Sequence, residues 1–274
     1  MSQHPAFASG NVAVITGGAD GIGFAAAKLF LYMGMRVCIA DVDAKKIKTA
    51  IESLGGGIAI VTDVSNLSDV NKLKDSVYET YGRVDVLMNN AGISVPSHSW
   101  DNYENWKANI NTNLWGVING VQVFVPPMIE QNAPGIIINT GSKQGITNPP
   151  GNPAYNVSKV GIKSLTETLQ HDLRNTEGCR LSAHLLVPGL TYSGLIRSWQ
   201  KEKPESAWTP EQVVEVLVDS LQRGDFYTIC ADNDTPRSLD NKRMAWAAGD
   251  LIENRPALAR WHPDYKDAYE DFIK

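Results

Sequence analysis

The chain has 274 residues, of which 43% are hydrophobic and 20% are charged. This composition supports a large apolar core and excludes a chain that is disordered throughout. Lysines and arginines number 25 against 30 acidic residues, and the formal net charge of −5 does not suit a protein that binds nucleic acid or an anionic membrane. We therefore expect one globular domain, residues 1–274.

The cysteines and histidines indicate neither disulfides nor a metal site. Cys38, Cys179 and Cys230 are far apart in the sequence, and the five histidines show no metal-ligand spacing. The N-terminus shows no basic segment followed by an apolar run, and the longest uncharged stretch, 108–129, carries several amides and two prolines. We expect a cytoplasmic protein with no metal ion, no membrane partner and no nucleic-acid partner.

Apolar strands alternate with helices along the whole chain. The expected strands are Val12–Ile15, Arg36–Ala40, Ile58–Val61, Val84–Met88, Gly135–Asn139, Leu181–Val187 and Phe226–Cys230. The expected helices span residues 22–33, 44–54, 67–81, 101–125, 154–175 and 211–222. Strands separated by helices pair in parallel through right-handed crossovers, so the pattern predicts a Rossmann-type α/β fold with a doubly wound sheet of about seven strands. Ligands of such sheets bind beyond the carboxyl ends of the strands.

The first expected strand ends in a glycine-rich turn, Thr16–Gly23, that leads into the first helix. Gly17 suits a tight turn, Gly21 permits the backbone to approach a pyrophosphate, and Gly23 lets the helix pack close to the strand. The helix N-terminus directs free N–H groups toward phosphates. The residues of this turn expected to bind a dinucleotide are Gly17, Asp20, Gly21 and Ile22.

Asp41 lies at the end of the second expected strand, 18 residues after Gly23. A carboxylate at this place accepts hydrogen bonds from both hydroxyls of an adenosine ribose and repels a 2′-phosphate. No lysine or arginine lies in the glycine turn or directly after Asp41. The sequence therefore favours NAD(H) over NADP(H). The alternative is that Asp41 only caps the helix that begins at residue 44.

Tyr155 and Lys159 are four residues apart on an expected helix, so their side chains lie on one face. The Lys159 ammonium is expected to lower the pKa of Tyr155, which suits the phenol to exchange a proton with an alcohol or a carbonyl. Ser142 follows the fifth expected strand, where its hydroxyl can bind the same oxygen. Such a Tyr–Lys pair is common on solvated helix faces, but together with the glycine turn and Asp41 it predicts hydride transfer.

In their order and spacing these motifs resemble the short-chain dehydrogenase/reductase family, over roughly residues 10 to 232. The shared segments are TGxxxGxG at 16–23, NNAG at 89–92, the helix asparagine Asn113, the serine Ser142, YxxxK at 155–159 and PG at 188–189. Two positions depart from the family pattern. Gly141 stands where the family often has a serine, and Ser193 replaces a threonine that follows the PG segment.

The resemblance implies a role for each of these residues. Tyr155 would be the general acid/base, Lys159 would lower its pKa and bind the nicotinamide ribose, and Ser142 would orient the substrate oxygen. Asn113 would hold a water molecule that continues the proton relay. The other implied cofactor contacts are Asp63 and Val64 at the adenine, Asn90 and Gly92 along the cofactor, and Thr191 at the carboxamide.

Three segments are expected to wall the substrate pocket: 93–100, 143–154 and 190–208. Gln144 is a candidate substrate contact in the second segment. The third belongs to an expected lid, residues 190–210. Its large side chains are Tyr192, Leu195, Ile196, Trp199 and Trp208. They favour an apolar, aromatic or alicyclic secondary alcohol or ketone, unless the aromatic groups instead pack the lid onto the protein.

Residues 232–274 extend past the part that resembles the family and carry an apolar helical face between positions 244 and 251. We expect this extension to pack on its own core or at the active-site mouth of a neighbouring subunit. The resemblance also implies a homotetramer, with a dimer as the next choice, formed through the helices 101–125 and 154–175.

The leading expectation is an NAD(H)-dependent oxidoreductase that transfers a hydride between the nicotinamide and a secondary alcohol or ketone. The alternatives are an NADP(H)-dependent carbonyl reductase, a non-catalytic dinucleotide sensor, and a methyltransferase, which also uses a glycine turn and a ribose-binding acid. Neither a sensor nor a methyltransferase needs the set of Asn113, Ser142, Tyr155 and Lys159, so these residues favour the oxidoreductase.

Overall fold

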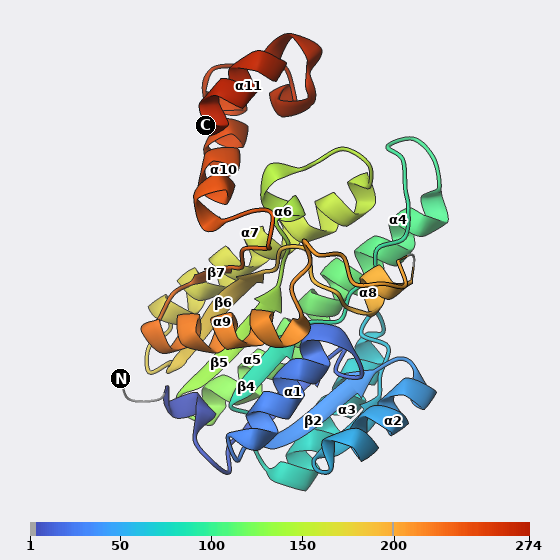
Figure 1. The fold of residues 1–274 in the computed structure, drawn as a ribbon. Coiled ribbons are helices and arrows are strands. Elements are labelled where there is room, and N and C mark those ends of the chain that lie inside the picture. The colour runs from blue at the N-terminus through green and yellow to red at the C-terminus, as the bar shows by residue number, and fades with distance from the viewer. Residues whose placement is uncertain (1–3, 199) are drawn as a thin grey trace.

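The computed structural model describes residues 4–198 and 200–274. Its centre is a seven-stranded parallel sheet with the strand order β3-β2-β1-β4-β5-β6-β7 (Figure 1). The strands are β1 Val12–Thr16, β2 Arg36–Asp41, β3 Ile58–Val61, β4 Val86–Asn89, β5 Gly135–Thr140, β6 Leu181–Val187 and β7 Tyr227–Ile229. The predicted doubly wound sheet is confirmed. Its order reverses between β1 and β4, and such a switch point opens a crevice for ligands.

Helices cover both faces of the sheet. The α-helices of the described residues are α1 Gly21–Tyr32, α2 Ala44–Leu54, α3 Leu67–Tyr81, α4 Tyr103–Asn109, α5 Gly116–Glu130, α6 Gln144–Thr147, α7 Pro153–Asn175, α8 Gly194–Arg197, α9 Pro210–Arg223, α10 Arg237–Ile252 and α11 Lys266–Ile273. Helices α1, α2 and α9 bury apolar side chains against one face, and α3, α5 and α7 against the other. No helix in the described ranges is long and apolar enough to span a membrane.

The strands are continuous apolar runs because both of their faces are buried. In β1, Ala13 and Ile15 belong to one core cluster, whereas Val12 and Val14 belong to the other. All four side chains are fully buried. Since successive side chains of a strand point to opposite faces, one short strand anchors both layers of helices.

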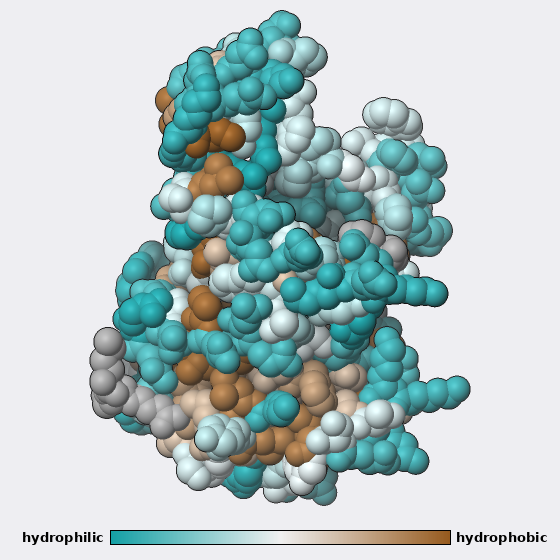
Figure 2. All heavy atoms as spheres, in the orientation of Figure 1, coloured by the Kyte–Doolittle hydropathy of each residue, from teal (hydrophilic) through white to brown (hydrophobic). Residues whose placement is uncertain are grey.

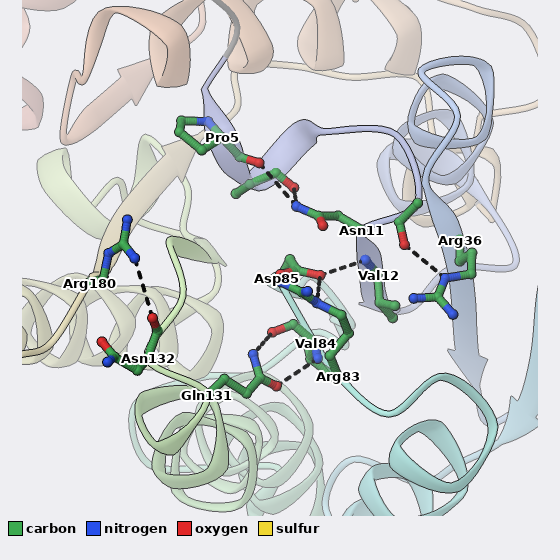
Figure 3. Close-up of polar contacts among 12 residues, drawn as sticks. Pro5, Asn11, Val12, Arg36, Arg83, Val84, Asp85, Gln131, Asn132 and Arg180 are labelled. Carbon is green, nitrogen blue, oxygen red and sulfur yellow. Dashed lines mark hydrogen bonds and ion pairs between the residues drawn. The ribbon is translucent and has the colours of Figure 1, made fainter.

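Polar contacts fix the amino ends of the strands, far from the glycine turn. The fully buried Asp85 accepts a hydrogen bond from the Val12 N–H at 2.8 Å and pairs with Arg83 (Figure 3). The Gln131 side chain accepts from the N–H of Val84 at 2.9 Å and donates to its carbonyl at 2.8 Å. For this reason β4 begins at Val86 rather than at the expected Val84, whose backbone groups are taken by a side chain.

The expected helix over 101–125 differs most from the structure. It is divided into α4, a π-helical segment Ile110–Trp115, and α5. Helix α5 also continues through Pro126 and Pro127 to Glu130. Its last turns bury Met128 in the core, which offsets the backbone hydrogen bonds that two prolines remove.

The C-terminal segment 232–274 stands apart from the sheet, at the top of the view in Figure 1. Helix α10 packs against α6, and α10 and α11 enclose a small cluster of Trp246, Ala259 and Tyr269. Hydrophilic residues cover most of the visible face of this segment (Figure 2). The connection to the rest of the molecule is therefore concentrated at α6, the short helix that follows Ser142.

Candidate functional site

One cavity of about 870 Å³ lies beyond the carboxyl ends of the strands. Its wall includes all the expected cofactor contacts and the expected catalytic serine, tyrosine and lysine. These residues are Gly17, Asp20, Gly21, Ile22, Asp41, Asp63, Val64, Asn90, Gly92, Ser142, Tyr155, Lys159 and Thr191. Asn113 does not line the cavity. The fold thus brings together motifs that are up to 174 residues apart in the sequence, from Gly17 to Thr191.

The glycine turn between β1 and α1 is held against the end of β4. Gly17 has a φ of +63°, and a Cβ atom built on it would lie 2.8 Å from the Cα atom of Ala91. Both the left-handed conformation and the close approach require glycine. The Thr16 hydroxyl oxygen accepts hydrogen bonds from the N–H groups of Asn90 at 3.0 Å and Ala91 at 3.2 Å. The side-chain amide of Asn90 donates to the carbonyls of Thr16 and Gly17, so Asn90 fixes the shape of the turn.

The Asp41 carboxylate is fixed at the end of β2 by two backbone groups. It accepts hydrogen bonds from the N–H of Ala19 at 3.3 Å and from the N–H of Asp43 at 3.1 Å. Helix α2 is capped by Asp43, which accepts from the N–H groups of Lys45 and Lys46. The alternative that Asp41 only caps this helix is therefore wrong.

Lys46 also lines the cavity, although no motif in the sequence predicted it there. It lies in the first turn of α2, five residues after Asp41, so it is not adjacent to that carboxylate in the sequence. The helix cap at Asp43 was the signal that could have located it, because it sets where α2 begins. The wall around the expected ribose position thus holds a cation as well as an anion.

The expected adenine and carboxamide contacts lie on loops after β3 and β6. The Asp63 carboxylate accepts hydrogen bonds from the N–H and the hydroxyl of Ser65. The Val64 carbonyl accepts one from the Asn119 side chain. Thr191 is buried and donates its hydroxyl proton to the carbonyl of Gly189 at 3.1 Å. Each contact fixes the backbone that forms the cavity wall.

Tyr155, Lys159 and Ser142 meet beyond the end of β5. The Lys159 Nζ atom lies 5.5 Å from the centre of the Tyr155 ring and donates a hydrogen bond to the Thr140 carbonyl at 2.9 Å. The Ser142 Oγ atom accepts a hydrogen bond from the Gln144 N–H at 3.1 Å. Burial raises the pKa of Tyr155, and a hydrogen bond with Ser142 opposes this rise. Burial lowers the pKa of Lys159 to about 8.

The expectation that Lys159 lowers the pKa of Tyr155 requires a correction. Removal of the phenol from water is the largest effect on its pKa, and this effect raises it. The Lys159 ammonium lies over the ring and donates to the Thr140 carbonyl. The hydrogen bond with Ser142 is the effect that opposes this rise in the pKa of Tyr155.

Asn113 lies in the π-helical segment between α4 and α5 and is fully buried. Its side chain accepts a hydrogen bond from the Ile93 N–H at 2.8 Å and donates to the Ile93 carbonyl at 2.9 Å and to the Ser158 hydroxyl at 3.1 Å. The side chain therefore holds the loop after β4 against α7. Short π-helical segments are common at functional sites, and here the segment turns Asn113 inward.

The expected lid contains the short helix α8, which packs on the glycine turn. Arg197 of α8 forms an ion pair with Asp20, and a Cβ atom built on Gly194 would collide with the Asp20 carboxylate. The base of the lid is fixed by backbone hydrogen bonds of Trp208 with Leu190 and Tyr192, both at 2.9 Å.

Tyr192 and Trp208, the aromatic residues of the expected lid that the structure describes, do not line the cavity. Tyr192 donates its hydroxyl to the Lys201 carbonyl, and Trp208 packs against a core cluster. Trp199 lies outside the described residues. Leu195 and Ile196 do line the cavity. For Tyr192 and Trp208, the structure thus supports the alternative that they pack the lid onto the protein.

The loop after β4 and the expected lid contribute aliphatic residues to the cavity wall. They are Ile93, Val95, Leu190, Leu195 and Ile196. Ser94, Lys143 and Gln144 contribute polar groups, whereas residues 145–154 do not reach the wall. Tyr155 is the one aromatic residue of this wall in the described part of the chain.

The structure describes all three cysteines, and each is free. Within residues 4–198 and 200–274, no group of three or more histidine, cysteine, aspartate or glutamate side chains could hold a metal ion.

This parallel sheet, with a nucleotide-type turn and a Tyr–Lys–Ser group at one cavity, defines a class of dinucleotide-linked oxidoreductases. Comparison with known proteins agrees with this class. A family model described as short chain dehydrogenase matches residues 11–204, and the chain belongs to this family. It is thus an oxidoreductase of a family that acts on alcohols and ketones.

Three similar proteins illustrate the range of the family. The crystal structure of a short-chain dehydrogenase/reductase from Burkholderia phymatum, in complex with NAD, is 29% identical, with a TM-score of 0.81 over 93% of this chain and 97% of that one. A 3beta-hydroxysteroid dehydrogenase 1 of Eggerthella lenta is 36% identical over 66% of this chain and 70% of its own. The 15-hydroxyprostaglandin dehydrogenase (NAD(+)) of Homo sapiens is 32% identical over 71% of this chain and 73% of its own.

Proposed function

We propose that the protein transfers a hydride between NAD(H) and an apolar secondary alcohol or ketone, with Tyr155 as the general acid/base. One observation carries the proposal: a single cavity includes both the Asp41 carboxylate and the Tyr155–Lys159–Ser142 group. Three strand spacings separate β2 from β5, roughly 14 Å. An extended dinucleotide can span that distance, with its adenosine at Asp41 and its nicotinamide near Tyr155.

The residues present fit such a cofactor. Gly17 keeps the turn packed against Ala91 at the end of β4, and the N-terminus of α1 offers N–H groups to a pyrophosphate. Asp41 would accept the ribose hydroxyls, and Lys159 would donate to the ribose next to the nicotinamide. When bound, the cofactor supplies or accepts the hydride.

The chain's own groups handle the proton. The Ser142 Oγ atom accepts a hydrogen bond from the Gln144 N–H, so its one hydroxyl proton is left for the phenol oxygen of Tyr155 or for the substrate oxygen. Burial raises the pKa of Tyr155, so the phenol is protonated at neutral pH. In the reductive direction this phenol gives its proton to the carbonyl oxygen as the carbon receives the hydride. In the oxidative direction it has to receive that proton, which higher pH favours.

Asn113 has a different role in this proposal from the one that the family resemblance implies. Its side chain holds the Ile93 backbone and does not line the cavity. We assign it as a positioning residue that keeps the loop after β4 against the helix carrying Tyr155 and Lys159.

NAD(H) is favoured over NADP(H) because Asp41 would repel a 2′-phosphate. Two of the similar proteins carry NAD in their descriptions. The second candidate, an NADP(H)-dependent carbonyl reductase, is favoured by Lys46, whose ammonium lies on the same wall and would attract that phosphate.

The substrate class is proposed from the residues that line the same cavity as Tyr155. Aliphatic residues of the loop after β4 and of the expected lid are among them, so an apolar group beside the reacting carbon is favoured. Two of the similar proteins are described as dehydrogenases of a hydroxysteroid and a hydroxyprostaglandin. Both names point to apolar alcohols of this kind.

The test is a fluorescence titration with NADH and NADPH, followed by assays of NAD with apolar secondary alcohols. We expect tighter binding of NADH, and turnover of at least one alcohol to its ketone. Asp41→Ala should weaken the binding of NADH and reduce the ratio of NADH affinity to NADPH affinity. The control Glu52→Ala, which removes an exposed acid of α2, should change neither the NADH affinity nor this ratio. Tighter binding of NADPH would overturn the cofactor assignment, and binding of neither dinucleotide would overturn the enzyme proposal.

We also propose a cytoplasmic homotetramer, with a dimer as the alternative. The expected interface helices leave large apolar side chains partly exposed: Trp115 in the π-helical segment, and Val157 and Val160 on α7. Light scattering of the purified protein gives the assembly mass, and a monomer at working concentration would contradict this part of the proposal.

A further inference from the structure

Lys143, which directly follows Ser142, lies between two carboxylates. Its Nζ atom is 3.2 Å from the Oδ2 atom of Asp232 and 2.7 Å from the Oδ2 atom of Asp240. The three side chains are 18%, 11% and 6% exposed, respectively. Ion pairs shielded from water to this degree depend strongly on geometry, and removal of one partner leaves a charge uncompensated.

The two carboxylates come from a part of the chain that the family model does not match, since the match ends at residue 204. Asp232 lies just after β7, in a tight turn closed by two backbone hydrogen bonds with Thr235. Asp240 lies in the first turn of α10 and is almost fully buried. Lys143 therefore connects the loop after β5, which carries Ser142, to the C-terminal segment 232–274.

The same cluster supports the root of the lid. The Leu190 N–H lies 3.5 Å from the Asp232 carboxylate, at the limit of a hydrogen bond. A Cβ atom built on Gly189 would lie 2.8 Å from that carboxylate and 3.1 Å from the Lys143 Nζ atom. The segment after β6 thus packs directly on the ion pair, and a side chain at position 189 would push into it.

Lys143 is linked to the Ser142 hydroxyl through one tight turn. The Ser142 carbonyl accepts a hydrogen bond from the Gly145 N–H at 2.9 Å, and the Lys143 carbonyl accepts one from the Ile146 N–H at 3.0 Å. The Gln144 N–H donates to the Ser142 Oγ atom. Any rotation of this turn, residues 142–147, therefore moves the hydroxyl that faces Tyr155.

We propose that Asp232 and Asp240, acting through Lys143, are positioning residues for Ser142. They set the orientation of the turn 142–147, so that the serine hydroxyl meets the phenol and the substrate oxygen. The inference rests on the proposed function of Ser142 and Tyr155. If so, residues of the C-terminal segment 232–274 affect the turnover rate, although none of them lines the cavity.

The test compares two carboxylates of α10. Asp240→Asn and Lys143→Met should each lower kcat about tenfold, because displacement of a catalytic group by about 1 Å costs up to 10²-fold, and the Kd for NADH should not change. Lys143→Arg keeps the positive charge and should restore most of kcat. The control is Asp250→Asn, which breaks the Asp250–Arg255 pair (3.1 Å, side chains 14% and 12% exposed) farther along the same helix. It should leave kcat unchanged.

Two further measurements separate positioning from a loss of stability. The double variant Lys143→Met/Asp240→Asn should be no slower than Lys143→Met alone, because Asp240 acts through Lys143. Hydrogen exchange of the amides in 142–147 should be about tenfold faster in Asp240→Asn and unchanged in Asp250→Asn. Should Asp240→Asn not fold, Asp232→Asn replaces it with the same expectations.

A kcat of Asp240→Asn within twofold of the wild type, or an equal loss in Asp250→Asn, overturns the inference. The hydrogen-exchange comparison needs no substrate. A wild-type protein without alcohol turnover would therefore contradict the proposed function, while the exchange of 142–147 would still decide whether the cluster positions the turn.

Discussion

Tyr155 and Lys159 are neighbours whose neutral forms are both favoured by burial. The pKa of the phenol is raised and that of the ammonium is lowered to about 8. Burial disfavours whichever form carries a charge, so it acts in opposite directions on an acid and on a base. The protein therefore presents a phenol that keeps its proton at neutral pH, beside an amine that can lose its charge in mildly alkaline solution.

Tyr155→Phe tests the acid/base role. Because the phenylalanine ring keeps the shape but lacks the hydroxyl, turnover should fall by about 10²–10⁴-fold, the usual contribution of general acid–base catalysis. NADH should bind as in the wild type. The measurements are steady-state turnover and a fluorescence titration, and a variant within tenfold of wild-type kcat would exclude Tyr155 as the proton donor.

Lys159 should make stability depend on pH. Burial lowers its pKa from the ordinary 10.5 to about 8, so between these values the unfolded chain binds more protons than the folded protein. The free energy of unfolding should then rise with pH across this window, by about 3 kcal/mol in total, and this gain is lost as pH falls from 10.5 to 8. Urea unfolding of the wild type and Lys159→Met measures it, because other titrating groups cancel in the difference. A difference that is flat from pH 7.5 to 10.5 would contradict the assignment.

At the scale of elements, α8 is held to the first turn of α1. The Asp20–Arg197 ion pair joins the expected lid, residues 190–210, to the glycine turn, and its side chains are 34% and 40% exposed. Such half-exposed pairs contribute little, about 0.2–1 kcal/mol, and salt screens them. A contact of this strength can open often enough to let a cofactor pass.

The Arg197→Ala variant should therefore release NADH about two- to fivefold faster than the wild type. This factor corresponds to the loss of an ion pair that contributes up to about 1 kcal/mol. High salt should accelerate release from the wild type but not from the variant. Stopped-flow fluorescence at low and high salt gives both rates. Equal salt dependence of the two proteins would show that the pair does not hold the lid.

The elements that the sequence predicts well are those with a strong local signal. β3, α2, α3 and β6 have the expected bounds, since an apolar run or an amphipathic helix ends at glycine or a capping residue. The π-helical segment Ile110–Trp115 could not be predicted, because its unusual hydrogen bonding is set by the buried contacts of Asn113 with Ile93 and Ser158. Helix α8 is only four residues long and is fixed by Asp20, which is remote in the sequence.

At the scale of the whole molecule, the cavity and the buried Asp85 carboxylate lie at opposite ends of the sheet. The cavity occupies the carboxyl ends, whereas Asp85 fixes the amino ends of β1 and β4 (Figure 3). Loops at the carboxyl ends can then adopt the shapes that a ligand requires, because the sheet beneath them is fixed elsewhere.

Asp85→Asn should lower the free energy of unfolding by about 2 kcal/mol, since it weakens charged hydrogen bonds to Val12 and Arg83. The Kd for NADH and kcat should stay as in the wild type, because the change lies far from the cavity. Urea unfolding and the fluorescence titration measure the two effects. An altered Kd would show that the two ends of the sheet are not independent.

The site shows the same division between local and remote signals. Asp41 and Ser142 lie at or just after strand ends, and a parallel sheet brings strand ends to one edge, so the sequence could predict their place at the cavity. The direction of the pKa shift of Tyr155 depends on burial, which spacing does not reveal. Asp232 and Asp240 reach Lys143 from nearly a hundred residues away, and neither belongs to a recognisable motif.

The Lys143 ammonium, which pairs with both Asp232 and Asp240, also affects how the C-terminal segment 232–274 can change in evolution. A chimera that grafts the tail of another relative onto residues 1–231 would keep the lysine but lose both of its acids. The graft would be compatible only if the incoming tail brought a carboxylate to the same place, or if a neutral residue replaced the lysine. Lineages that exchange tails should therefore change position 143 and its acidic partners together.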